Sequence, residues 1–288
     1  MQQGLIILGA LVLGFLFRQG ADLVWLVRYV LMWLLFIAFL GMRIDLSVVR
    51  RFHLKIVLVN LLMPVLLYLT VGRWYPEVGM ALVAFTLAPT AAAAAVFAQF
   101  LRIDVAAVTV STLCTSLIVA LALPGFLRWV SPTAGSIPVL DIFLPILSLV
   151  GLPLAAAFLL GRIRPALGVR VKRLGRFSIV LFAFNIWVAG GRASQFLFER
   201  TDTNWSVVAG IALATGLVSI AQFELGTLLG KPHYPAEANL SMGRKNNMFG
   251  LWIALTYLHP LAALGPICNV LWQNGYNSWQ LMRKPKAV

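Results

Sequence analysis

Long apolar runs separated by short polar segments are the dominant pattern along this chain. The runs are continuous, whereas strands of a membrane β-barrel alternate apolar and polar residues over about ten positions. A bilayer interior of about 30 Å requires roughly 20 apolar residues per helix. The pattern therefore predicts an all-α polytopic membrane protein with ten transmembrane helices, at 4–18, 22–41, 53–73, 77–101, 104–128, 138–161, 175–198, 204–229, 235–257 and 260–282.

The composition indicates that lipid is the solvent of the folded chain. Hydrophobic residues occupy 61% of the 288 positions and charged residues only 11%, whereas a soluble domain uses about a quarter charged residues. The formal net charge is +14, a value that suggests nucleic acid when it occurs in a soluble protein. Here the basic residues lie mainly between the apolar runs, so we expect no nucleic-acid partner and no soluble domain.

The distribution of basic residues predicts the orientation in the membrane. Loops on one side hold fifteen Lys and Arg residues, and loops on the other side hold five, with Arg28 counted among them. Because cytoplasmic loops carry the excess of positive charge, we expect both termini in the cytoplasm of a cell with a bacterial-type inner membrane. The first apolar run, 5–17, lacks a preceding basic segment, so we interpret it as a retained first helix of this multi-pass protein.

The chain divides at the basic segment 162–176. Residues 1–161 hold a first repeat of five helices and the sixth helix, and residues 162–288 hold the remainder of the second repeat. Because five is odd, the second repeat enters the membrane with inverted orientation, as in many secondary transporters. The fourth helix of each repeat is interrupted, at 87–92 and 241–247. Such paired interruptions indicate broken crossing helices, four and nine, and a substrate site near the midplane.

The second interruption carries the most informative residues. Arg244 and Lys245 are adjacent cations in an apolar run, and Asn246 and Asn247 follow them. A charge at the bilayer centre costs at least about 2.5–3.5 kcal/mol, so we expect one of the cations to face a central cavity and attract a carboxylate. The alternatives are a structural ion pair, for example with Glu224, or a helix that begins later in the chain. Gly243 is expected to let the backbone leave helical geometry.

The first interruption is the expected partner of the second. Pro89 removes a backbone donor and disfavours helix at the residue before it, and the alanine run 91–95 permits another helix to approach closely. The alternative is a simple proline kink. We assign Pro89, Thr90 and Ser241 to one substrate site with Arg244, Lys245, Asn246 and Asn247.

Isolated polar residues in the other spans have a simpler expected role. Residues such as Asn60, Thr109 and Asn269 are each expected to bond neighbouring helices together, and the alternative is that they line the same central cavity. Glu224 is the acid that lies well inside an apolar run, and it is therefore the candidate for an intramembrane proton carrier.

Motifs of enzymes and of cofactor sites are missing from the sequence. It contains no HExxH, GxSxG or GxxxxGK[ST] motif and no CxxC pair. Cys114 and Cys268 lie in separate apolar runs, which supports neither a disulfide framework nor a metal site. We expect no enzyme activity, no cofactor, no bound metal and no transport driven by ATP within this chain.

Several stretches together resemble the bile acid:sodium symporter superfamily of secondary transporters. They are Ala88-Pro89, 101–112, 241–254 and 260–266, and the resemblance covers nearly the whole chain. It implies a panel domain of helices 1, 2, 6 and 7 and a core domain of helices 3–5 and 8–10, with helices 4 and 9 unwound where they cross. It also implies organic anions as substrates, moved by alternating access.

The sequence departs from that family at the sodium site. Sodium-coupled members carry Glu-x-Gly-x-Gln-Asn in the ninth helix, and this chain reads Ser-Met-Gly-Arg-Lys-Asn at 241–246. Two polar residues of the fourth helix that serve the sodium site in the family correspond here to Ala94 and Ala95. Thr112 matches the family at its position in that site. A hard cation needs several oxygen ligands, and an adjacent ammonium repels it.

These observations predict a sodium-independent carrier of a small organic anion, with proton coupling through Glu224 as a further hypothesis. One alternative is a sodium:organic anion symporter with a rearranged ion site. The other is a non-transporting membrane sensor or scaffold with the same fold. The expected partners are the anion and the lipid bilayer, and the expected assembly is a monomer or homodimer.

Overall fold

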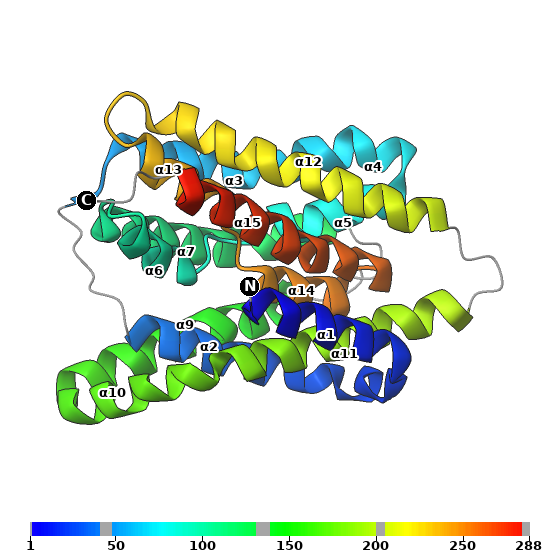
Figure 1. Ribbon diagram of the computed structural model, residues 1–288, viewed down its shortest axis with the longest axis horizontal. Coiled ribbons are helices and arrows are strands. Elements are labelled where there is room, and N and C mark those ends of the chain that lie inside the picture. Colours follow the sequence, from blue (N-terminus) through cyan, green and yellow to red (C-terminus); the bar gives the residue numbers. More distant parts are fainter. Residues whose placement is uncertain (1, 41–47, 131–138, 200–204, 284–288) are drawn as a thin grey trace.

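The computed structural model describes residues 2–40, 48–130, 139–199 and 205–283, and these residues are almost entirely helical (Figure 1). No strand occurs among them, which confirms the prediction of an all-α chain. The predicted span edges at 41, 138 and 204 lie outside the described residues. The α-helices are α1 Gln2–Leu16, α2 Val24–Leu40, α3 Arg51–Leu69, α4 Val71–Trp74, α5 Pro76–Thr86, α6 Ala93–Phe100, α7 Val105–Val130, α9 Val139–Ile163, α10 Pro165–Lys172, α11 Ser178–Glu199, α12 Trp205–Gly230, α13 Pro235–Gly243, α14 Asn247–Tyr257 and α15 Leu264–Arg283, and the 3₁₀ helices are η1 Arg18–Leu23, η3 Arg173–Phe177 and η4 Pro260–Ala263.

Several helices are long and apolar enough to cross a bilayer, as expected of a multi-pass membrane protein. Within the described residues there are five by length and composition, and a sixth is reached if the bent pair that contains α10 and α11 counts as one span. Each of the five exceeds the roughly 20 residues that a bilayer interior requires. The five are Arg18–Leu40, Arg51–Trp74, Val105–Val130, Phe143–Ile163 and Trp205–Gly230.

The other predicted spans differ from simple long helices for identifiable reasons. Helix α1 has 15 residues, and the predicted spans 77–101 and 235–257 are each divided into two helices. We expected the basic segment 162–176 to be a loop between spans. That prediction is wrong, because most of the segment forms α10 and η3. Pro165 stands at the first helical position of α10, where its fixed φ favours helix and its missing N–H has no cost.

The helices form two layers (Figure 1). The lower layer contains α1, η1, α2, α9, α10, η3 and α11, which contact one another as α1 with α11 and α2 with α9. The upper layer contains α3 to α7 and α12 to α15, which pack as α12 with α13 and α15 and as α3 with α5 and α7. Helix α14 lies where the two layers meet and contacts α2 and α11.

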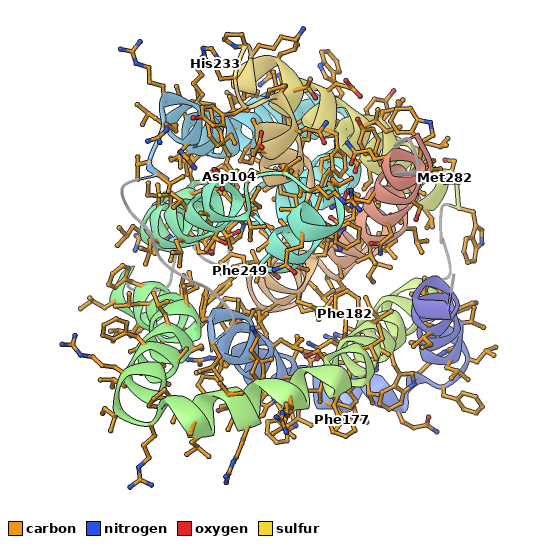
Figure 2. All side chains as sticks on the ribbon, turned by 60° about the vertical axis from the view of Figure 1, so that its left-hand side comes forward. Asp104, Phe177, Phe182, His233, Phe249 and Met282 are labelled. Carbon is orange, nitrogen blue, oxygen red and sulfur yellow. The ribbon has the colours of Figure 1, made fainter. Side chains whose placement is uncertain are left out.

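An apolar cluster fills part of the boundary between the layers. It joins Phe249 and Trp252 of α14 to Leu31 and Leu35 of α2. Figure 2 labels Phe249 together with Phe182 of α11, which packs against the same cluster. Apolar packing therefore holds the layers together over this part of the boundary, with one hydrogen bond from Nδ2 of Asn185 to Sδ of Met248 at 3.6 Å.

Small residues bring the backbones of the upper layer close together. A Cβ atom added to Gly265 would overlap the carbonyl group of Ala81, and one added to Gly250 would meet the carbonyl oxygen of Ala84. Both alanines lie on α5. Close backbone approach increases van der Waals contact, which replaces the hydrophobic effect as the packing force between helices in lipid.

The turn between α6 and α7 is formed by local hydrogen bonds. Arg102 has φ of 51°, and the amides of Arg102 and Ile103 donate to the carbonyls of Gln99 and Ala98 at 3.0 and 3.1 Å. This is the pattern of a Schellman motif. Asp104 (Figure 2) then accepts from the amides of Ala106 and Ala107, at 2.9 and 3.1 Å, and so caps the start of α7.

Candidate functional site

The two interruptions predicted from the sequence meet in the structure. Helix α5 ends at Thr86 and α6 begins at Ala93, while α13 ends at Gly243 and α14 begins at Asn247. Thr90 and Lys245 form an isolated antiparallel bridge between these segments. The amide of Ala91 donates to the carbonyl of Arg244 at 2.7 Å, and the amide of Asn246 donates to the carbonyl of Pro89 at 2.8 Å. Each broken segment thus satisfies backbone groups of the other, as an apolar surrounding requires.

Side chains satisfy further polar groups at the breaks. The hydroxyl of Thr90 donates to the carbonyl of Ser241 at 2.7 Å, and the amide of Thr90 donates to the hydroxyl of Thr115 at 3.0 Å. The amide of Lys245 donates to Oε1 of Gln273 at 3.2 Å. Thr90 and Ser241 therefore join the two segments, and neither appears among the residues that line a cavity.

Gly243 has a different role from the one we expected. It lies in the last turn of α13, and no described glycine has a positive φ. A Cβ atom at this position would overlap the ring of Phe223, which is fully buried and stacks on Tyr276 with ring centroids 4.1 Å apart. Gly243 is therefore required for close packing of α13 on α12, not for an unusual backbone conformation.

Lys245 is a buried cation with an uncharged partner. Only 1% of its surface is exposed, and its Nζ donates to Oδ1 of Asn60 on α3. Within the described part of the chain it forms no ion pair. Removing an ammonium group from water costs several kcal/mol unless other charges or hydrogen bonds compensate, so this charge makes the local electrostatic potential strongly positive.

Arg244 is a buried cation with free donors. Its side chain is 7% exposed, and its guanidinium carbon lies 3.6 Å from the centroid of the Phe97 ring. Its Nε and Nη1 atoms are buried and have no hydrogen-bond partner among the described residues. A guanidinium stacked on a ring is held in a fixed plane, and its remaining N–H groups suit the two oxygens of a carboxylate.

A cleft of about 1240 Å³ lies between the two layers, beside the broken segments. Its charged lining residues are all cations, namely Arg244 and Lys245 from the upper layer and Lys172 from the lower layer. Neither Asp nor Glu is among its described lining residues. Leu31, Leu35 and Phe182 contribute apolar surface from the lower layer, and Phe97, Thr109, Asn246, Asn247, Gln273 and Asn274 complete the wall on the other side.

Two amide side chains at the start of α14 border this cleft. Asn246 caps the helix by accepting from the amide of Phe249 at 3.3 Å. Asn247 accepts from Nδ2 of Asn269 at 2.8 Å, and its own Nδ2 is buried without a hydrogen-bond partner among the described residues. Asn247 can therefore donate to a bound ligand without giving up an existing hydrogen bond.

Two candidate residues do not join the site. The hydroxyl of Thr112 donates to the carbonyl of Val108 at 3.1 Å within its own helix, and Thr112 does not line the cleft. Glu224 is exposed on α12 and accepts from the hydroxyl of Tyr276 at 2.6 Å. The alternative of an ion pair between Glu224 and the cations of the second interruption is wrong, because neither cation contacts it.

Three residues of the site were not selected by the sequence argument. Phe97 beneath Arg244, Gln273 beside Lys245 and Lys172 across the cleft belong to three different helices. Arg28, which we counted with the loops, lies inside α2. Among the described residues, no three His, Cys, Asp or Glu side chains form a group that could hold a metal ion.

No model of a known protein family matches this chain, and no curated protein matches it significantly. The geometry and charge of the cleft are therefore the basis on which a function is proposed.

Proposed function

We propose that this chain is a secondary transporter that carries a small organic anion by alternating access and without sodium. The observation that carries the proposal is the charge of the cleft, whose charged lining residues are all cations. Two of these cations, Arg244 and Lys245, lie in the break between α13 and α14. Fixed positive charge in a region of low dielectric attracts an anion and repels a metal cation.

Arg244 is the residue proposed to bind the anion. Its buried Nε and Nη1 have no hydrogen-bond partner in the described structure, and a buried donor left unpaired costs about 1–3 kcal/mol. A carboxylate that accepts from both atoms removes this cost and adds charge-assisted hydrogen bonds. Phe97 holds the guanidinium plane, and Nδ2 of Asn247 supplies a third donor.

Lys245 is proposed to replace a coupling cation. It lies deeper than Arg244, bonded to Asn60, and takes the place of a residue that binds sodium in the family that the chain resembles. An ammonium group there supplies the positive charge that sodium would bring with it, so we propose that transport needs no sodium. Glu224 lies away from the cleft, and we do not include it as a proton carrier in this proposal.

The arrangement of the helices supports the same proposal. The breaks at 87–92 and 244–246 lie between α5 and α6 and between α13 and α14, and we propose that these are corresponding helices of two inverted five-helix repeats. The lower and upper layers then correspond to a panel domain and a core domain, with the substrate between them. We propose an atypical member of the bile acid:sodium symporter superfamily in the cell membrane, with cytoplasmic termini and a cleft that opens to the cytoplasm beside Lys172.

The experiment uses purified full-length protein. A thermal-shift screen against acetate, benzoate, succinate and taurocholate selects the anion that raises the unfolding temperature most. Counterflow of that radiolabelled anion is then measured in proteoliposomes, in sodium and in potassium buffer. We expect equal uptake in both buffers, and a loss of about 100-fold in affinity in Arg244→Gln, because truncating one partner of a buried charge pair costs 2–5 kcal/mol.

Arg170→Gln is the matched control, because Arg170 is an exposed arginine of α10 and does not line the cleft. It should transport like the wild type. Uptake that requires sodium would support the symporter alternative and contradict this proposal. Binding without counterflow would support a sensor, and unchanged affinity in Arg244→Gln would remove the site assignment.

A further inference from the structure

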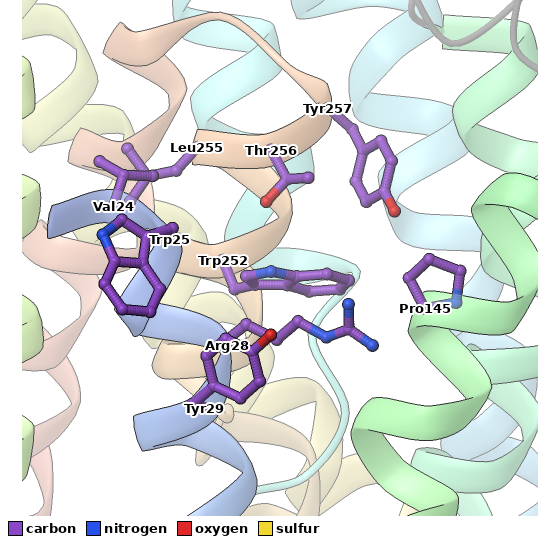
Figure 3. Close-up of a pocket in the computed structure, with 9 residues that line it drawn as sticks. All are labelled: Val24, Trp25, Arg28, Tyr29, Pro145, Trp252, Leu255, Thr256 and Tyr257. Carbon is purple, nitrogen blue, oxygen red and sulfur yellow. The ribbon is translucent and has the colours of Figure 1, made fainter. Parts of the chain in front are cut away.

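A second cavity, of about 500 Å³, lies between the same two layers at the other end of α14 (Figure 3). Its volume falls within the range of small-molecule pockets. One arginine, Arg28 of α2, is the charged residue of its wall. The remaining lining residues are Val24, Trp25, Tyr29, Pro145, Trp252, Leu255, Thr256 and Tyr257.

This cavity, the Arg28 pocket, continues the path of the large cleft. Helix α2 lines the cleft with residues between Leu31 and Ala38 and lines the Arg28 pocket with residues between Val24 and Tyr29. Helix α14 contributes Asn247 and Met248 to the cleft and residues 252–257 to the pocket. The two cavities therefore occupy successive levels along the same pair of helices, with the cluster of Phe249 and Leu31 nearby.

The guanidinium of Arg28 is held in place, and among the described residues no acidic side chain pairs with it. Its Nη2 donates to the hydroxyl of Ser148 on α9 at 2.5 Å, and that hydroxyl donates in turn to the carbonyl of Pro145 at 2.9 Å. Its Nε is buried and has no hydrogen-bond partner among the described residues. The hydrogen bond to the uncharged Ser148 thus orients the guanidinium group of Arg28, and its Nε is left to donate to a carboxylate oxygen.

Four of the eight other lining residues around this cation are aromatic. Trp252 and Tyr257 pack edge to face with ring centroids 5.6 Å apart, and Trp25 and Tyr29 do so at 6.2 Å. In the view of Figure 3 the guanidinium of Arg28 lies below the indole of Trp252, and Thr256 and Tyr257 lie above it. Such walls suit an apolar or aromatic ligand body, while the arginine recognises its anionic group.

We infer that the Arg28 pocket is a second anion site, which takes a small monocarboxylate with an apolar or aromatic body. It rests on the proposed function in one respect: a carried anion that reaches the cleft at Arg244 passes this pocket on its way between the layers. An arginine that merely extends its head to the membrane surface leaves its donors in water. The buried Nε of Arg28 and its bond to Ser148 are the opposite arrangement.

The test measures binding of 4-fluorobenzoate to detergent-solubilised protein by ¹⁹F NMR titration. The variants are Arg28→Gln, Arg28→Lys, Arg244→Gln and the double variant Arg28→Gln/Arg244→Gln, with Arg170→Gln as the control. We expect two equivalents bound by the wild type, one by each glutamine single variant and none by the double variant. Because a hydrogen bond to a charged group contributes about 1.5–3 kcal/mol, each lost site should weaken by at least about tenfold.

Tryptophan fluorescence assigns the site that is lost. Trp25 and Trp252 line the Arg28 pocket and not the cleft, so quenching by 4-iodobenzoate should fall in Arg28→Gln and persist in Arg244→Gln. Arg28→Lys keeps the charge without the planar guanidinium group, and it replaces Arg28→Gln in the test if that variant does not fold. We expect Arg28→Lys to bind 4-fluorobenzoate in the Arg28 pocket at least about tenfold more weakly than the wild type.

The inference would be overturned if Arg28→Gln and Arg28→Lys both bound two equivalents of 4-fluorobenzoate with the affinity of the wild type. It would also be overturned if the wild type bound no 4-fluorobenzoate at Arg28. The proposed function fails separately, through unchanged binding and counterflow in Arg244→Gln. Loss of the Arg28 equivalent together with unchanged binding in Arg244→Gln would leave the second site in place and remove the first.

Discussion

The two broken segments solve the same backbone problem with different chemistry. Residues 87–92 are small or neutral, and they exchange hydrogen bonds with 244–246 through Pro89 and Ala91. The second segment provides matching backbone groups and in addition carries Arg244 and Lys245. Geometry and charge are therefore divided between the two breaks. The first allows the crossing without a charge of its own, and the second carries the charges on which the proposed anion site depends.

The largest test of this division removes the partner of Lys245. In Asn60→Leu the buried ammonium loses its hydrogen bond to Oδ1 of Asn60, and a buried charge left without a partner costs about 3 kcal/mol. We expect the free energy of unfolding, measured by SDS titration in mixed micelles, to fall by about this amount.

The double variant Asn60→Leu/Lys245→Met supplies the comparison. It contains neither polar group, so we expect it to regain most of the lost stability. Additive effects of the two single changes would show that Lys245 and Asn60 do not depend on each other.

A second test concerns packing behind the charged break. Gly243→Ala places a methyl group against the ring of Phe223, and overpacking of this kind costs about 1–3 kcal/mol. Gly275→Ala is the matched control, because nothing lies within contact of the added methyl group and alanine favours helix. Thermal unfolding in detergent should show a lower unfolding temperature for the first variant only. Equal unfolding temperatures would contradict close packing of α13 on α12.

A third test separates structure from binding at the neutral break. Thr90→Val removes the hydrogen bond from the hydroxyl of Thr90 to the carbonyl of Ser241, which should lower the free energy of unfolding by about 1 kcal/mol. Binding of the selected anion should change less than twofold. Thr70→Val, at an exposed bond within α3, is the control with little effect. A large loss of affinity in Thr90→Val would place Thr90 in direct contact with the ligand.

The smallest expected effect concerns the turn that follows the neutral break. Arg102 has a φ that glycine adopts without strain, so Arg102→Gly should raise the free energy of unfolding by about 0.5–1 kcal/mol. Anion binding should not change, because Arg102 does not line the cleft. A loss of stability would mean that the arginine side chain contributes more than its backbone strain costs.

The breaks themselves were predictable from local sequence. Pro89 within an apolar run and two cations within another are departures that a continuous lipid-facing helix does not tolerate. Both interruptions occur at these residues in the structure. Phe97, Gln273 and Lys172, which complete the site, were not predictable. They come from three different helices, and a single sequence does not show which helices contact one another.

Other errors have equally physical causes. Arg28 was counted with the loops because it lies near the end of an apolar run, yet its stem follows α2 into the boundary between the layers. Glu224 was chosen because it lies well inside an apolar run, but position along a helix does not specify which face is buried. Thr112 is buried and bonds its own helix, a use of threonine that the residue type alone does not distinguish from ligand binding.

The bridge between Thr90 and Lys245 constrains how the molecule can move. Separating the two broken segments would break hydrogen bonds of Ala91 and Asn246, and each amide left without a partner in an apolar surrounding costs several kcal/mol. The two half-helix pairs are therefore expected to travel as a single block. If the proposed transport takes place, a bound anion would move together with the residues that bind it. The amides of Ala91 and Asn246 would then stay protected from hydrogen exchange in every conformation.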